Sequence, residues 1–138
     1  MRNALVNHLQ DYNQSNQAET IKSYAGELTD RDKGMRLRIN LPAILVLVIE
    51  GFPLRDVKES QFSLLFLTET VTLSKEDVEE DAVKLVDTYM NYLWENYRFE
   101  DEHHYYHLVD LQNSRATLLM NDHKYTIFEV PVFARIIS

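Results

Sequence analysis

The chain of 138 residues lacks cysteine, which excludes disulfide bonds, a catalytic thiolate and cysteine-ligated zinc. Glycine is also scarce: Gly26, Gly34 and Gly51 are the three that occur, and they cannot form a phosphate-binding loop or a dinucleotide-binding fingerprint. The Gly-x-Ser-x-Gly motif of serine hydrolases is absent as well. We therefore expect no nucleotide-dependent chemistry and no cofactor.

The sequence also lacks an apolar run long enough to cross a bilayer, because the longest one, Leu41 to Ile49, is far shorter than a membrane span. Residues 1–10 carry charges and amides where a signal peptide needs an apolar core. We expect neither a membrane-spanning protein nor export by a signal peptide.

Basic residues are outnumbered, 14 against 22 acidic ones, which gives a net charge of −8. The acidity is concentrated in residues 75–102, which contain three basic and ten acidic residues. The one cationic stretch is diluted by two aspartates and consists of Arg31, Lys33, Arg36 and Arg38. Because unspecific binding to phosphate backbones needs clustered Lys and Arg, no nucleic-acid binding is expected.

Apolar periodicity predicts a single α+β domain over residues 1–138, with a mixed, mainly antiparallel sheet packed by a short N-terminal helix and one long central helix. Helical spacing places the helices at about residues 2–14 and 74–97, the second with Ser74 as its N-cap. Strands are predicted near residues 21–24, 43–49, 61–73, 105–111, 115–120 and 125–137. The strand at 43–49 is continuously apolar, which indicates cover on both faces. Pro131 cannot donate to a ladder, so it predicts a bulge or an edge at its position.

The long helix carries aromatic side chains outside its apolar stripe. The stripe runs from Val78 to Tyr97 in steps of three and four residues. Met90, Tyr92 and Trp94 lie off this stripe. Aromatic residues beyond the core-facing side of a helix suggest a second contact surface, and a partner subunit is one candidate.

Three histidines, His103, His104 and His107, lie within five residues and are the strongest candidates for metal chemistry. Oxygen ligands are available next to them in the acidic triplet of residues 100–102. On a strand, His103 and His107 would share a face and His104 would not, so a mononuclear site needs a loop geometry. No metal-binding signature is present, and a solvated, histidine-rich linker after the helix is the favoured interpretation.

Other side chains offer weaker catalytic candidates. Glu50, Glu69 and Glu129 lie in or beside apolar strands, where burial would raise the pKa of a carboxyl group and produce a general acid. No spacing pairs these glutamates with one another, and Ser74 and Ser114 belong to no nucleophile motif. We therefore expect no enzyme and no metal site.

One stretch of the sequence resembles a known family. The segment Ile21-Lys22-Ser23-Tyr24-Ala25-Gly26-Glu27-Leu28 is followed by a charged spacer and then by Leu41-Pro42-Ala43-Ile44-Leu45-Val46. This order resembles the gp37-like proteins encoded in the tail-gene clusters of Mu-like phages and prophages. Asn113-Ser114-Arg115 and the terminal strand are similar to the end of those proteins, so the resemblance covers nearly the whole chain.

The resemblance implies a tail-terminator-like structural protein without an active site. Such a protomer forms a ring, often hexameric, at the head-proximal end of the tail tube, where it contacts tail-tube and neck proteins. The implied location is the bacterial host cytoplasm during assembly and then the virion tail. The chain departs from the family in its acidic helix start, residues 76–81, and in its histidine patch.

A ring needs two different complementary surfaces on each protomer. We expect the basic stretch of one subunit to approach an acidic region of the next, either residues 100–102 or the helix start with Glu76, Asp77, Glu79, Glu80 and Asp81. Tyr92 and Trp94 complete the expected subunit interface. Two other functions stay open: a small metal-dependent hydrolase that uses the histidine patch, and a monomeric adaptor that binds another protein.

Overall fold

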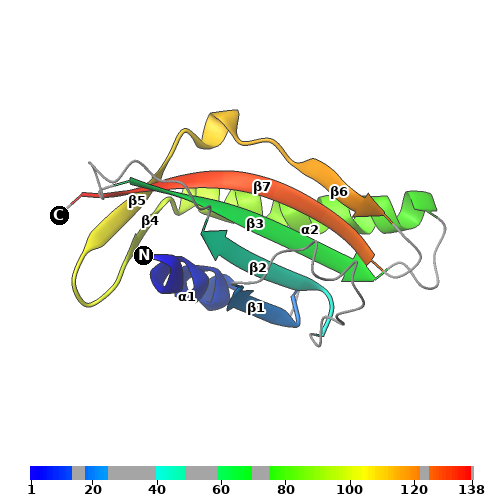
Figure 1. Ribbon diagram of the computed structural model, residues 1–138, viewed down its shortest axis with the longest axis horizontal. Coiled ribbons are helices and arrows are strands. Elements are labelled where there is room, and N and C mark those ends of the chain that lie inside the picture. Colours follow the sequence, from blue (N-terminus) through cyan, green and yellow to red (C-terminus); the bar gives the residue numbers. More distant parts are fainter. Residues whose placement is uncertain (14–17, 25–39, 49–58, 70–74, 122–124, 138) are drawn as a thin grey trace.

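In the computed structural model, residues 1–13, 18–24, 40–48, 59–69, 75–121 and 125–137 are described. These residues form two α-helices and seven strands, with three strands after the first helix and four after the second (Figure 1). Their bounds are α1 Arg2–Tyr12, β1 Thr20–Ser23, β2 Ala43–Val48, β3 Glu59–Glu69, α2 Lys75–Glu95, β4 Arg98–Glu100, β5 Tyr105–Val109, β6 Thr117–Asn121 and β7 Tyr125–Ile136, with a short 3₁₀ turn, η2, at Leu111–Asn113. The predicted α+β class is confirmed.

The strands form one mixed sheet in the order β1-β2-β3-β7-β5-β4, and β6 pairs with β7 beside β5. The β1–β2 pair is parallel and the other pairs are antiparallel, as expected for a mainly antiparallel sheet. Strand β7 lies at the centre, because β3 pairs with it from Glu59↔Arg135 to Glu69↔Tyr125. The other side of β7 is shared by β6 and β5.

Strand β2 has both faces covered, as its unbroken apolar sequence predicts. Ile44 and Val46 belong to the main core, whereas Ala43 and Leu45 point to the opposite face and join a smaller cluster. All four are fully buried, and burying a Val, Leu or Ile side chain contributes roughly 1.5–3 kcal/mol.

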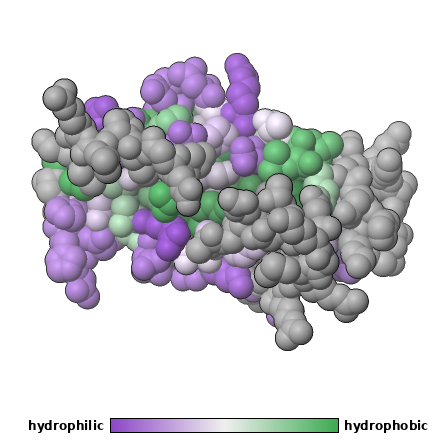
Figure 2. Space-filling model, in the orientation of Figure 1, coloured by the Kyte–Doolittle hydropathy of each residue, from purple (hydrophilic) through white to green (hydrophobic). Residues whose placement is uncertain are grey.

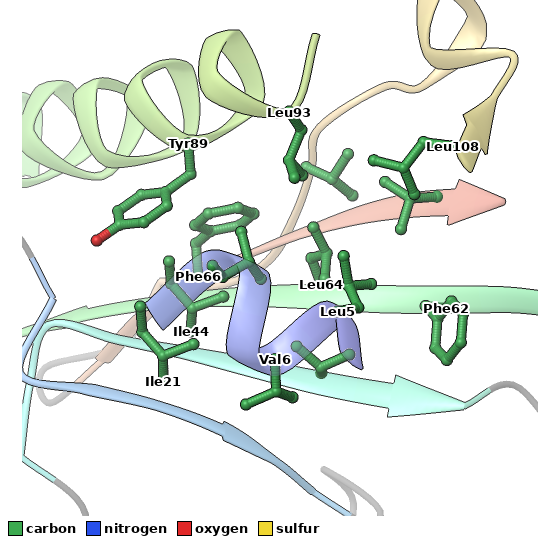
Figure 3. Close-up of a cluster of buried hydrophobic side chains, with 14 of the residues drawn as sticks. Leu5, Val6, Ile21, Ile44, Phe62, Leu64, Phe66, Tyr89, Leu93 and Leu108 are labelled. Atoms are coloured by element: carbon green, nitrogen blue, oxygen red, sulfur yellow. The ribbon is translucent and has the colours of Figure 1, made fainter. Parts of the chain in front are cut away.

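Both helices pack on the same face of the sheet, and the main core lies between the two layers (Figure 3). Helix α1 contacts β1, β2 and β4, and helix α2 contacts β3 and β7. The core-facing side of α2 consists of Ala82, Leu85, Val86, Tyr89 and Leu93, which follow the predicted three- and four-residue steps. Within the described part of the chain, no helix is both long and apolar enough for a transmembrane span.

Helix α2 ends earlier than predicted, at Glu95 instead of about Tyr97. Asn96 closes it, since its backbone N–H and its side-chain Nδ2 both donate to the carbonyl oxygen of Tyr92, at 2.7 and 3.1 Å. Residues 98–100 then form the three-residue strand β4, where no strand is predicted from the sequence. So short a strand has too few residues to show the alternation that would predict it.

Pro131 lies within the central strand, opposite Ser63 of β3. On its other side the ladder is interrupted, since β6 pairing reaches Glu129 and β5 pairing begins at Phe133. The Pro131 carbonyl accepts a 2.8 Å hydrogen bond from Ser114 Oγ in this gap. The predicted local edge at Pro131 is thus confirmed, and no N–H is missing from a continuous ladder.

Candidate interaction surfaces

Aromatic side chains of α1 and α2 pack against each other between the two helices. Tyr12 and Tyr92 stack with ring centroids 4.1 Å apart, and the Tyr89 hydroxyl donates to Asn13 Oδ1 at 2.8 Å. Asn13 Nδ2 in turn donates to the carbonyl of Ala18 at 2.7 Å, which connects the end of α1 to the segment before β1. Burial, and next the neighbouring Tyr12, raise the pKa of Tyr89 to about 12. Tyr92 lies off the apolar stripe of α2 because it packs on α1. This contact explains its position without a partner subunit.

His8 of α1 belongs to the same contact between the two helices. Its Nε2 lies 2.7 Å from the carbonyl oxygen of Asn96, and its ring stacks on Phe99. Because a carbonyl oxygen can only accept, Nε2 carries the hydrogen. The Tyr92 hydroxyl donates to the His8 carbonyl at 3.2 Å. His8 therefore holds α1 against the end of α2 and the start of β4, and it borders a hollow of about 450 Å³ between α1 and the β4–β5 hairpin.

The acidic and histidine-rich segment forms the turn of the β4–β5 hairpin, and Asp101 organises it. Asp101 Oδ1 accepts the backbone N–H groups of His103 and His104 at 2.8 and 2.9 Å, and Oδ2 accepts the Tyr106 hydroxyl at 2.6 Å. The Tyr106 hydroxyl first, and then the His103 and His104 N–H groups, lower the pKa of Asp101 to about 2. Asp101 thus has a structural role in the turn.

The three histidines of the predicted metal candidate do not converge. His103 and His104 are exposed in the turn, whereas His107 lies in β5 opposite Arg98 of β4 and Arg135 of β7. Arg135 also donates to Glu59 on β3 at 2.9 Å. Among the residues that the structure describes, no three His, Asp or Glu side chains are grouped closely enough to hold a metal ion.

The Trp94 side chain is 55% exposed at the end of α2. It borders a hollow of about 290 Å³ together with Tyr97, Leu108, Asp110, Leu111 and Gln112. Tyr97 is also exposed, and the Arg98 guanidinium lies 5.5 Å from its ring centroid. The end of α2 and the η2 turn thus form an aromatic patch, which we define as Trp94, Tyr97 and Leu111.

The predicted acidic surface is only partly described. Glu80 and Asp81 are exposed on α2, and Glu80 Oε1 lies 3.6 Å from Lys84 Nζ. Glu100 and Glu102 are exposed beside the hairpin turn. Glu76, Asp77 and Glu79 lie within α2, but their side chains are outside the described part. The basic stretch Arg31, Lys33, Arg36 and Arg38 lies wholly outside the described residues, so the expected charge contact stays a prediction.

Among the weaker catalytic candidates, the three that the structure describes, Glu69, Glu129 and Ser114, do not form a common site. Glu69 is exposed at the end of β3, and Glu129 lies in β7 between Leu65 and Thr117. Ser114 is used in the bond to Pro131, whereas Glu50 and Ser74 lie outside the described residues.

Strand β6 presents an apolar surface that is not among the candidates predicted from the sequence. Leu118 and Leu119 are 44% and 43% exposed, although they lie in a predicted strand. The sequence does carry a sign of this surface, because two adjacent leucines break the strict alternation of a half-buried strand.

No protein-family model matches this chain, and no curated protein shows significant similarity to it.

Proposed function

We propose that the chain is a structural protein of a phage or prophage tail, similar to a tail terminator. It forms a ring at the head-proximal end of the tail tube and docks onto tail-tube and neck proteins. The proposal rests on the resemblance of the segments around Tyr24 and Pro42, and on surfaces suited to protein contacts. The observation that carries it is the aromatic patch at the end of α2, where Trp94 is 55% exposed.

The aromatic patch favours a docking function for an energetic reason. Tryptophan and tyrosine are enriched among the residues that dominate binding energy at protein interfaces. An exposed Trp94 beside the Leu111 hollow leaves apolar area in water that a partner can cover. The patch thus offers an anchor for a tail protein or a neighbouring subunit.

A closed ring also needs a second, different surface. In our proposal the acidic residues Glu80 and Asp81, or Glu100 and Glu102, face the basic stretch of the next subunit. These four carboxylates are exposed, so such a contact forms between solvated groups and weakens as salt rises. Asp101 accepts hydrogen bonds within the hairpin. Its neighbours Glu100 and Glu102 are therefore the carboxylates of this turn that a partner subunit would contact.

Light scattering coupled to size exclusion tests the ring. We expect a closed oligomer, a hexamer of the 16.3 kDa chain in the leading case, that dissociates as the salt concentration rises. Reversing the charge of Arg31, Lys33, Arg36 and Arg38 should weaken assembly. Lys22→Glu is the matched control, because Lys22 is exposed on β1 outside the expected interface.

An oligomer whose size is unchanged by charge reversal contradicts the expected contact. A strict monomer at every concentration favours the monomeric adaptor instead, and the aromatic patch then becomes its binding surface.

A further inference from the structure

The hollow beside the aromatic patch carries a single charge among its described lining residues, and that charge is negative. It belongs to Asp110, which directly precedes the η2 turn. The rest of the lining is aromatic, aliphatic or an amide, and consists of Trp94, Tyr97, Leu108, Leu111 and Gln112. A carboxylate thus lies beside two exposed aromatic rings.

Asp110 adopts a backbone conformation that glycine would adopt more easily. Its φ is 56° and its ψ is 31°, in the left-handed region where a Cβ atom is unfavourable, although aspartate tolerates this region better than most residues. Asp110 is also the N-cap of η2, a position where an aspartate side chain usually accepts a backbone N–H. No such side-chain bond forms here, and the Asn113 N–H donates to the Asp110 carbonyl instead, at 2.9 Å. The turn therefore closes without using the carboxylate.

The Asp110 carboxylate is also without a cationic partner in the part of the chain that the structure describes. It accepts one long hydrogen bond, from Gln112 Nε2 at 3.4 Å. Arg98 lies against the Tyr97 ring and does not line the hollow. Asp110 is exposed, and Figure 2 shows hydrophilic residues gathered where Figure 1 draws the turn between β5 and β6. Its charge is therefore available to a group that enters the hollow.

We propose that this hollow binds an arginine side chain of a partner protein, with the guanidinium packed on the aromatic rings and hydrogen-bonded to Asp110. A guanidinium stacks on aromatic faces and donates paired hydrogen bonds to a carboxylate, so both kinds of group in the lining match it. Tyr97 already contacts one guanidinium, that of Arg98, 5.5 Å from its ring centroid. The hollow of about 290 Å³ lies below the usual range of small-molecule sites, roughly 300–1,000 Å³, and suits one side chain.

The charge of Asp110 decides between arginine and other side chains. An apolar side chain in the hollow would remove water from the carboxylate without giving it a partner, which is unfavourable. An acidic side chain would be repelled. Lysine has the right charge but lacks the planar group that stacks on a ring while donating two parallel hydrogen bonds.

This inference rests on the proposed docking function of the aromatic patch and specifies the chemistry of the partner. The two can fail separately. A strict monomer contradicts the ring but leaves the binding of arginine to the hollow to be measured on the same protein. A hollow that does not bind arginine leaves the solution mass of the ring unchanged.

The test is a titration with Nα-acetyl-arginine amide, followed by NMR at the indole N–H of Trp94, the one tryptophan of the chain. The protein is diluted until its solution mass is that of a single chain. Nα-acetyl-citrulline amide is the control probe, because it replaces the guanidinium by an uncharged group of nearly the same shape. We expect a saturable shift with the arginine probe and binding of the citrulline probe that is weaker by about tenfold or more, the effect of one charged hydrogen bond. Equal binding of the two probes, or no shift with either, overturns the proposal.

Variants of Asp110 separate binding from a structural role. Asp110→Asn should weaken binding of the arginine probe by about tenfold or more. Glu95→Gln is the matched control, since Glu95 is exposed at the end of α2 but does not line the hollow. Asp110→Gly should lose binding to the same extent without losing stability in urea, because glycine adopts the left-handed conformation freely. Equal weakening in Glu95→Gln, or a marked loss of stability in Asp110→Gly, overturns the proposal.

Discussion

Asp101 combines three acceptor roles in one exposed carboxylate. It accepts two backbone N–H groups of the hairpin turn and the hydroxyl of Tyr106. A carboxylate that accepts several hydrogen bonds is favoured in its charged form, which is why the pKa of Asp101 is lowered to about 2. The turn is thus held by a group that stays ionised in all but strongly acidic solution.

The first prediction concerns how the contribution of Asp101 to the hairpin turn depends on pH. Because the pKa of Asp101 is lowered from 3.8, its contribution to the hairpin is fully present above about pH 4 and is lost as the pH falls through about 2. In Tyr106→Phe the largest cause of the shift is removed, so the pKa of Asp101 should rise toward 3.8. NMR titration of the carboxyl measures it, with Tyr105→Phe, an exposed neighbour, as control. An unchanged pKa in Tyr106→Phe would refute the assignment.

Tyr89 gives a second prediction at this scale. Tyr89→Phe keeps the ring that contacts Tyr12 edge-on but removes the hydrogen bond to Asn13. We expect a loss of about 1 kcal/mol in the free energy of unfolding, the usual net value of one such bond. Urea denaturation measures the loss, and Tyr97→Phe, an exposed tyrosine, should change little. Equal stability of both variants would show that the Asn13 bond contributes nothing.

Among the elements, α1 is short but closes one side of the core. Leu5 and Leu9 are fully buried against the sheet. We predict that Leu9→Ala lowers the free energy of unfolding by about 2–5 kcal/mol, the range for large-to-small changes in cores. Thermal and urea unfolding measure it, and Asn3→Ala on the exposed side of α1 is the control. A small loss for Leu9→Ala would mean that α1 is dispensable for the sheet.

The elements with strong local signals were predictable from the sequence. Strand β2 follows from its unbroken apolar run, and the core side of α2 follows from its helical spacing. Strand β4 was missed because three residues carry no period. The roles of Asp101 and Tyr92 were also missed, since hydrogen bonds and ring stacking between distant segments leave no mark in local patterns.

At the scale of the whole molecule, the single tryptophan offers a test of the proposed assembly. Trp94 is the one tryptophan of the chain and it is exposed at the aromatic patch. We predict that its fluorescence is readily quenched by acrylamide in the dissociated protein and is protected in the oligomer. The urea-denatured chain gives the reference for full access. Equal quenching in both states would place Trp94 outside the subunit interface.

The position of β7 has a consequence for synthesis. This strand pairs with β3, β5 and β6, yet it spans residues 125–136 and leaves the ribosome after all of its partners. Roughly 70 further residues are made after β3 before β7 is complete, which takes several seconds at ordinary translation rates. During this time the apolar strand β3 lacks the partner that pairs with its full length. Until β7 is made, Phe62, Leu64 and Phe66 therefore lack their neighbours Val132, Val130 and Phe128 across the strand pair, so the main core is completed last.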